Sequence, residues 1–210
     1  MASILDLLNT DIGKQLISSA SEKTNTSPDR TASVLSSAMP LILGAMKRNA
    51  ATPDGAASLN SALENNKHDG SLLDNLGGLL SGGGLDDLMN DGGGILGHVL
   101  GGKQERVEQT ISKTSGVDAG SVGQIIKMAA PIIMGILGSQ KRKDNVSQNG
   151  LGDLLGSVLG SQSTNDQSLI ETLLDADGDG SVIDDVAGMV LGGNKKKGGL
   201  GGMLGGLFGK

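Results

Sequence analysis

The sequence predicts an all-α protein, a helical bundle built from two matching halves. Apolar residues recur at the three- and four-residue spacing of an α-helix in the first 49 residues. The same pattern returns without a gap 91 residues further along the chain. Hydrophobic residues make up 37% of the chain and 36 residues are glycine, so the core has to come from a few apolar segments separated by glycine-rich ones.

Residues 1–49 form the first predicted half. Their helical spacing comes from a small apolar set: Ile4, Leu7, Leu8, Leu16, Ile17 and Ala20. A polar break follows, and Ser27 and Pro28 then mark the start of a second helix, with serine as N-cap and proline at the first helical position. Pro40 is expected to kink this helix or to begin a new one.

Residues 50–94 contain a predicted helix at about 56–65, then a polar turn in which His68 is expected to be exposed. The stretch 71–94 is rich in glycine and carries short leucine clusters. We expect an arm that is mobile or built from very short helices, with fast amide exchange over 81–94.

Residues 95–138 form the second predicted half. At the offset of 91, Pro40 matches Pro131, Ala38 matches Ala129, and each proline is followed by three aliphatic residues and a glycine. An internal duplication is the simplest account of this match. The alternative is a chance similarity between two buried helices.

Three segments carry a resemblance to a known family: Ala-Met-Pro-Leu-Ile-Leu-Gly at 38–44, the run from Ile95 to Gln104 with Val107-Glu108-Gln109, and the turn at 113–116. They resemble the YidB-like family, a bacterial family of unknown function. The resemblance covers residues 1–138 and extends at most to the Asp-rich segment at 175–185. It implies an all-helical bundle with a duplicated half and no catalytic residues to transfer.

Residues 139–164 are polar and glycine-rich, and they are predicted to be a linker that holds one short amphipathic helix. Within it, Leu-Gly-Asp-Leu-Leu at 151–155 echoes Leu-Gly-Gly-Leu-Leu at 76–80. Residues 193–210, with lysines followed by Gly-Gly-Leu repeats, are predicted to be a flexible tail.

A calcium site is predicted in residues 165–192, which read as a helix-loop-helix with an EF-hand-like loop. Calcium takes six to eight oxygen ligands around a tight turn. The loop offers Asp175, Asp177, Asp179, the carbonyl of Ser181, and Asp184 or Asp185 to complete the shell. No Lys or Arg lies in 144–194 to balance these carboxylates, so a hard divalent cation is the natural counter-charge.

The end of this loop departs from the EF-hand pattern. Position 12 carries Val186 in place of the bidentate glutamate, which predicts weaker or less selective binding. The competing interpretation is an ordinary Asp/Gly turn whose acidic residues cap the next helix.

Composition excludes several classes of function. A net charge of −6, no Trp or Tyr and one Phe argue against nucleic-acid binding. The absence of cysteine removes disulfides and thiolate chemistry. The apolar runs are shorter than the roughly 20 residues that span a bilayer, so the sequence predicts a cytoplasmic protein with no transmembrane segment. The run Lys195–Lys197 beside the apolar tail allows only weak contact with a membrane surface.

A non-enzymatic interaction or self-assembly protein is the predicted function, with a protein partner or a second copy as its ligand. The reason is the set of Leu-Gly-x-Leu-Leu clusters, which are too apolar to stay solvated and too short to fold alone. A calcium-responsive regulatory module is the first alternative. An enzyme with a site of scattered Ser, Asp and Lys is the second. His98 is expected to be a helix residue with a local hydrogen bond, and no histidine metal site is expected.

Overall fold

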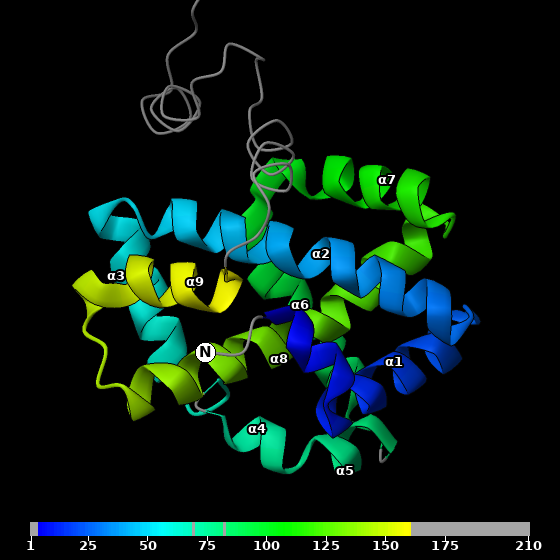
Figure 1. The fold of residues 1–210 in the computed structure, drawn as a ribbon, viewed down its shortest axis with the longest axis horizontal. Coiled ribbons are helices and arrows are strands. Elements are labelled where there is room, and N and C mark those ends of the chain that lie inside the picture. Colours follow the sequence, from blue (N-terminus) through cyan, green and yellow to red (C-terminus); the bar gives the residue numbers. More distant parts are fainter. Residues whose placement is uncertain (1–3, 69, 82, 161–210) are drawn as a thin grey trace, which may run out of the picture. The chain divides into compact units, whose positions relative to one another are not determined.

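The computed structural model describes residues 4–68, 70–81 and 83–160, and these residues are all-α, as predicted (Figure 1). Within those ranges there is no β-strand. The α-helices, in chain order, are α1 (Asp11–Thr24), α2 (Pro28–Asn49), α3 (Pro53–Glu64), α4 (Ser71–Asp74), α5 (Leu76–Ser81), α6 (Leu85–Leu100), α7 (Gln104–Ser115), α8 (Ala119–Lys143) and α9 (Leu151–Leu159). Three 3-10 turns, η1 (Ile4–Asn9), η2 (Gly101–Lys103) and η3 (Gln148–Gly150), precede α1, α7 and α9.

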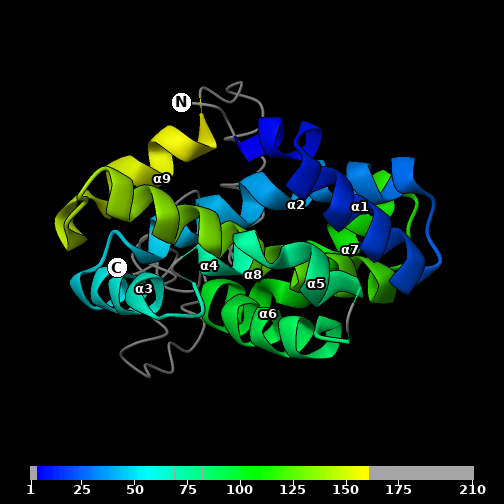
Figure 2. The same ribbon diagram turned by 90° about the horizontal axis from the view of Figure 1, so that it is seen from below.

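Helix α8 is the central element of the bundle. It contacts α1, α2, α3, α4, α6, α7 and α9, and most of its residues are buried (Figures 1 and 2). The burial explains its composition, because a helix that is covered on most sides has no place for a polar stripe. Its last turn, Lys141–Lys143, carries the cations that a helix C-terminus favours.

The same helix corrects one expectation. Among the described residues, α8 is long and apolar enough to cross a membrane by length and composition, whereas the sequence alone suggested only shorter apolar runs. In the bundle, 72% of that apolar window is buried, as in the core helix of a folded domain. Burial against neighbouring helices therefore accounts for its apolar character.

Side chains and turns mark the helix ends as the sequence suggests. Thr10 accepts a hydrogen bond from the Gly13 amide at 3.2 Å, and Asp118 accepts one from the Ser121 amide at 2.9 Å, which satisfies otherwise unpaired N–H groups. Ser27 is the N-cap of α2 and Pro28 its first residue, as predicted, although the serine side chain forms no capping hydrogen bond.

The two long helices, α2 and α8, start at the spacing that the sequence repeat predicts. Helix α2 starts at residue 28 and α8 at residue 119, which is the offset of 91 seen in the sequence. Pro40 and Pro131 are both buried inside these helices, and neither begins a new one. The residues that end the preceding helices, Asn25 and Gly116, both adopt the left-handed conformation, with φ of 50° and 68°.

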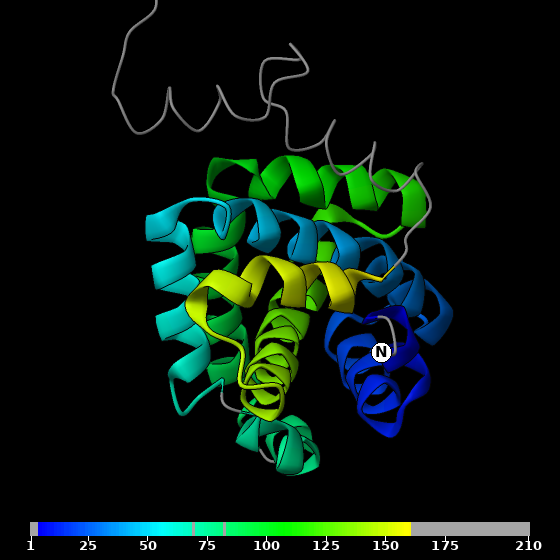
Figure 3. The ribbon, with the colours of Figure 1, turned by 60° about the vertical axis from the view of Figure 1, so that its left-hand side comes forward.

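The third helices also follow related routes. Helix α3 follows α2 in the chain and packs against α8, whereas α9 follows α8 and packs against α2 (Figures 1 and 3). Each long helix thus packs against the short helix that follows the other long helix in the chain. Helix α9 belongs to the same structural unit as the rest, so residues 151–159 are part of the core and not a linker.

The glycine-rich region 71–94 differs from the expected arm. Its first part forms the very short helices α4 and α5, which is one of the two expected forms. From Leu85 onward, however, the chain forms the 16-residue helix α6, which lies along α8. Gly92 is buried there, and a methyl group on it would come within 1.8 Å of the Lys127 carbonyl oxygen. The glycine permits close approach of two backbones, which the sequence pattern does not distinguish from a loop.

Candidate functional site

The predicted calcium ligands lie outside the described residues. Asp175, Asp177, Asp179, Ser181, Asp184 and Asp185 all belong to the segment after Gly160. Within the described part of the chain, no group of three or more His, Asp or Glu side chains is placed to hold a metal ion. The candidate site in the described part of the chain is therefore a pair of neighbouring cavities.

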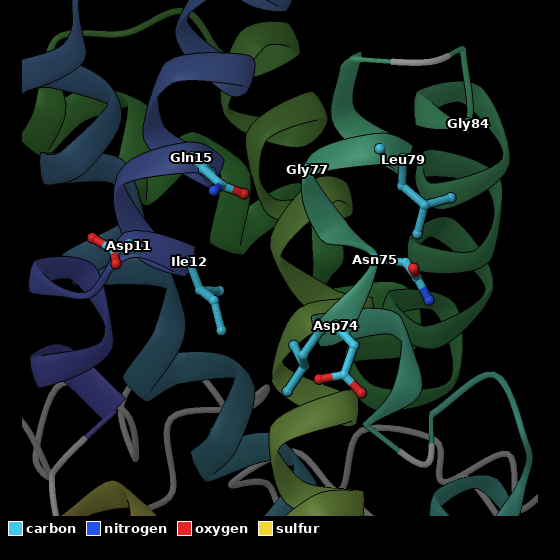
Figure 4. Close-up of a pocket in the computed structure, with 10 residues that line it drawn as sticks. Asp11, Ile12, Gln15, Asp74, Asn75, Gly77, Leu79 and Gly84 are labelled. Atoms are coloured by element: carbon cyan, nitrogen blue, oxygen red, sulfur yellow. The ribbon is translucent and has the colours of Figure 1, made fainter.

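The larger cavity, of about 650 Å³, lies between α1 and the helices α4 and α5 (Figure 4). Ile12 and Gln15 extend from α1 toward Asp74, the last residue of α4, and Asn75, which joins α4 to α5 (Figure 4). Its full lining is Asp11, Ile12, Gln15, Leu73, Asp74, Asn75, Gly77, Gly78, Leu79 and Gly84. The cavity is thus walled by segments about 60 residues apart in the sequence.

A second cavity, of about 400 Å³, is lined by residues of α4 and α6 together with Leu79 of α5. It shares three lining residues with the first: Asn75, Leu79 and Gly84. Its other lining residues are Asn66, Lys67, Ser71, Leu72, Asp87, Leu88 and Asp91. Helices α4 and α5 therefore border both cavities.

We call residues 71–81, which comprise α4 and α5, the strap. One side chain of the strap is fully buried: Leu76 is 1% exposed. Leu72, Leu73 and Leu80 are half-buried and pack against the core, and Leu79 is half-buried. Leu73 lies against α8, with its Cγ 3.5 Å from the Cβ position of Gly135. The strap thus covers α1, α6 and α8 with a small apolar face.

Acidic residues surround the strap. Asp11 and Asp74 line the larger cavity and Asp87 the second, and all three are exposed. Within the described ranges none of the three forms an ion pair, whereas the neighbouring Asp86 pairs with Lys23 at 3.1 Å. Lys67 also lines the second cavity. The rim is therefore mainly negative and suits a cationic ligand.

His68 is buried, which corrects the expectation of an exposed turn residue. It is 7% exposed, and its ring joins two helices. Nδ1 lies 3.1 Å from the Ala62 carbonyl oxygen at the end of α3, and Nε2 lies 2.9 Å from the Asp91 carboxylate in α6. The ring therefore bridges the end of α3 and the middle of α6 through its two nitrogens. His68 thus joins α3 to α6 just before the strap begins, and we call this contact the first clamp.

His98 behaves as the sequence predicts. It is an exposed residue of α6, and its Nδ1 lies 2.8 Å from the Gly94 carbonyl oxygen one turn earlier. The Asn49 side-chain amide donates to the carbonyl oxygens of His98 and Val99, each at 3.2 Å, and so ties α2 to the end of α6. Neither histidine lines the two cavities.

A second clamp joins α3 to α8. The Lys141 ammonium, which is 9% exposed, donates to Glu64 Oε1 at 2.8 Å, and the Asn60 amide donates to the same oxygen at 3.0 Å. The hydrogen bond from Lys141 is the main reason that the pKa of Glu64 lies below its ordinary value, and the bond from Asn60 adds to it. The Glu64 side chain is 59% exposed, so solvent screens the pair.

This clamp predicts a pH effect on stability. Because the folded pKa of Glu64 is lowered, its contribution is complete above the ordinary value of 4.5 and is lost as the pH falls through the lower folded value. Glu64→Gln should therefore unfold with a shallower acid dependence than the wild type in urea titrations from about pH 7 to about pH 3. Glu22→Gln, at an exposed position of α1, is the control, and an equal flattening there would contradict the assignment.

The comparisons with known proteins bear on the whole described unit. A family model described as bacterial proteins of unknown function (DUF937) matches residues 6–140. The chain belongs to this family. No curated protein and no solved structure matches the chain. The DUF937 match includes α1, the strap, α6 and all but the last three residues of α8, so both cavities lie inside the family's region.

The sequence did not single out the residues around these cavities. The acidic rim comes from three separate segments, and no local motif links Asp11 to Asp74. The usable signal was the Leu-Gly-Gly-Leu-Leu cluster at 76–80, because a strongly apolar pattern with two glycines is too short to fold alone and must lie on something. The sequence thus indicates the cluster but not the surface on which it packs.

Proposed function

We propose that this DUF937 protein is a non-enzymatic interaction protein. Its binding site is the surface of α1, α6 and α8 that the strap covers, which we call the seat of the strap. The observation that supports this proposal is the weak attachment of the strap between two cavities. Helix α5 has six residues, two of them glycine, and an isolated helix of that length is not stable in water. Contacts with α1 and α6, and not its own helical propensity, hold it in place.

The seat has the properties of a groove that accepts an amphipathic helix. When the strap moves away, the apolar surface under Leu73 and Leu76 becomes available to another short helix with leucines on one face. Local opening of this kind is expected at elements with few buried contacts. The ligand is therefore a short segment with apolar residues at helical spacing. Asp11 on α1 and Asp87 on α6 stay in place when the strap moves, and they favour a segment that carries lysine or arginine.

An enzymatic use of the cavities has less support. Both ring nitrogens of His68 lie against protein acceptors, and His68 lines neither cavity. The titratable residues that line the cavities are Asp11, Asp74, Asp87, Asp91 and Lys67, spread over two separate hollows. An interaction site needs no convergence of such groups.

The test uses the strap itself as the ligand. In the full-length chain, Leu76→Ser should loosen α5, and a synthetic peptide of residues 70–83 should then bind and raise the melting temperature of the variant. The same peptide with Leu76→Ser is the matched control and should have no effect. Absence of binding to a variant that circular dichroism shows to be folded would contradict the proposal.

A disulfide trap keeps the test decisive if Leu76→Ser fails to fold. The chain has no cysteine, so Leu73→Cys with Gly135→Cys introduces a single pair, at positions where the Leu73 Cγ lies 3.5 Å from the Gly135 Cβ position. Oxidation should abolish peptide binding and reduction should restore it. Equal binding in both redox states would place the peptide outside the seat.

An internal duplication remains our proposal for the origin of the fold. It is supported by the equal starts of α2 and α8 at an offset of 91, the buried prolines at equivalent positions, and the exchanged packing of α3 and α9. Superposition of residues 14–46 on 105–137 in an experimental structure should bring Pro40 onto Pro131. Different helix axes after the prolines would contradict a common origin.

Calcium binding by the loop at 175–185 is a second proposal, supported by the acidic sequence pattern alone. Isothermal titration with calcium should show binding in the millimolar range typical of weak sites, and Asp177→Ala with Asp179→Ala should remove it while the bundle stays folded. Identical titrations of the wild type and the variant would show that the loop is an ordinary turn.

Membership of the YidB-like family in particular, and a cytoplasmic location, also stay proposals.

A further inference from the structure

We propose that the second cavity binds a small organic ammonium ion, a primary amine on a short apolar body, and that the bound amine joins the strap to α6. Binding here goes beyond the proposed function, because the amine binds while the strap stays in place. Three features of the cavity support it: a carboxylate held in a fixed position, further hydrogen-bond acceptors with a net negative charge, and an apolar wall.

The Asp91 carboxylate is the fixed group. It lines the cavity from α6, and its Oδ2 lies 2.9 Å from Nε2 of His68, which is itself 7% exposed. The other oxygen, Oδ1, has no hydrogen-bond partner among the described residues. The Asp91 side chain is 26% exposed, so it is partly shielded from water. A charge-assisted hydrogen bond to an ammonium group is stronger in such a place than at an open surface.

The other acceptors come from three neighbouring segments. Asp87 lies one turn before Asp91 on α6 and lines the same cavity, and residues four apart share a helix face. Asn66 and Asn75 also line the cavity, and no described group donates to either amide oxygen. The Asn75 nitrogen donates to the Ser71 carbonyl at 3.5 Å, which leaves the amide oxygen as an acceptor. An ammonium group has three N–H donors, which matches this set of acceptors.

The charge of the lining favours a cation over an anion. Asp87 and Asp91 carry two negative charges and Lys67 one positive charge, which leaves a net charge of −1. Lys67 forms no ion pair with a carboxylate in the described part of the chain, so it does not neutralise either aspartate. Its charge weakens the attraction for a cation without reversing it.

Leucines form the apolar wall of the cavity. Leu72 and Leu79 come from the strap and are half-buried, and Leu88 comes from α6 and is 4% exposed. The volume of about 400 Å³ has room for a body such as a phenyl ring. A ligand that fills the cavity contacts the strap and α6 together, so its binding stabilises the closed strap by mass action.

The experiment titrates the full-length chain with 2-phenylethylamine, observed by saturation-transfer NMR. The chain has one Phe and no Trp or Tyr, so the ring signals of the probe are clear of protein signals. We expect a dissociation constant of about 0.1–10 mM, typical of a ligand this small. The neutral alcohol 2-phenylethanol has the same body and should bind at least about tenfold more weakly. Equal binding of the amine and the alcohol would overturn the proposal.

Charge variants locate the amine. Asp87 is exposed and without an ion pair in the described ranges, so Asp87→Asn should fold normally and weaken binding about threefold to tenfold. Asp86→Asn is the matched control, because Asp86 pairs with Lys23 and lines neither cavity, and binding should stay within about twofold. Lys67→Gln should strengthen binding about twofold to threefold. Equal effects at 86 and 87, or weaker binding in Lys67→Gln, would contradict the assignment.

The acidic loop at 175–185 is a competing place for a cation in the same chain. Asp177→Ala with Asp179→Ala removes two of its carboxylates and leaves the cavity unchanged. We expect this variant to bind 2-phenylethylamine as the wild type does. Loss of binding in this variant would assign the amine to the loop and overturn the proposal.

Amide hydrogen exchange tests the link between the strap and α6. With 2-phenylethylamine at ten times its dissociation constant, the amides of α5 should exchange about tenfold more slowly, and 2-phenylethanol at the same concentration should leave them unchanged. Unchanged exchange with the bound amine would show that it does not hold the strap.

The two proposals fail separately. If peptide 70–83 does not bind to Leu76→Ser while the amine binds with the stated charge dependence, the proposed function of the seat is wrong and the amine site stands. If the peptide binds and the amine does not, the seat stands and the amine site is wrong.

Discussion

Alanine at position 92 should destabilise the bundle, whereas alanine two residues later in the same helix should stabilise it. Gly92 is buried where α6 lies on α8, and its new methyl group would meet the Lys127 carbonyl oxygen at 1.8 Å. Backbone atoms on both sides prevent a local adjustment, so the helices must separate. We expect a loss of about 3 kcal/mol or more, at the upper end of the cost of overpacking.

Gly94 is the matched control. It is exposed on the same helix and has nothing within 4 Å of its Cβ position. Gly94→Ala should therefore gain about 0.5–1 kcal/mol, because alanine loses less backbone entropy in a helix. Urea unfolding of the two variants measures both effects, and a change of the same sign in both would show that α6 does not lie on α8 as described.

The second large effect is expected at His68. Its ring is buried and holds the Ala62 carbonyl and the Asp91 carboxylate, at 3.1 and 2.9 Å. His68→Ala removes the contacts of the ring with both acceptors, leaves the Asp91 carboxylate without its partner and opens a cavity. We expect a loss of about 2–4 kcal/mol in the free energy of unfolding, measured by thermal or urea denaturation.

His98 provides the comparison at an exposed site. His98→Ala loses one hydrogen bond to Gly94 within the same helix turn, and the change should stay within about 0.5 kcal/mol. We therefore predict a much larger loss in the free energy of unfolding for His68→Ala than for His98→Ala. Similar losses for both would mean that burial and the bond to Asp91 contribute nothing measurable.

The helices of the two predicted halves could be predicted because each signal for them lies in a short stretch of sequence. Spacing of the apolar residues gives the helices, Ser27 and Pro28 give the start of α2, and the repeat at 91 residues gives the start of α8. Each signal reflects the conformation of a few neighbouring residues. These features therefore agree with the observed helices.

The central part of the chain was harder to predict because glycine has two opposite uses. The stretch 85–94 has the composition of a loop, yet it is helical since Gly92 permits the contact with α8. His68 was misjudged for a related reason: the turn around it is polar, and its partner Asp91 lies 23 residues away. Burial of this kind depends on tertiary packing and not on local sequence.

The two cavities could not be derived from the sequence, although the strap could be suspected. Their walls come from α1, the strap and α6, and only the fold brings these together. The Leu-Gly-Gly-Leu-Leu cluster indicated a segment that must pack on another surface. Its position between two hollows supports the proposal that the surface can take a different occupant.

Native-state amide hydrogen exchange on the full-length chain tests this account most directly. If the strap is the element that opens, the amides of α5 should exchange through a local opening, on the order of 100-fold or more faster than those of α8, while α6 from Leu85 onward stays protected. Exchange of α5 only through global unfolding, with the same protection as α8, would contradict the central claim that the strap yields its seat.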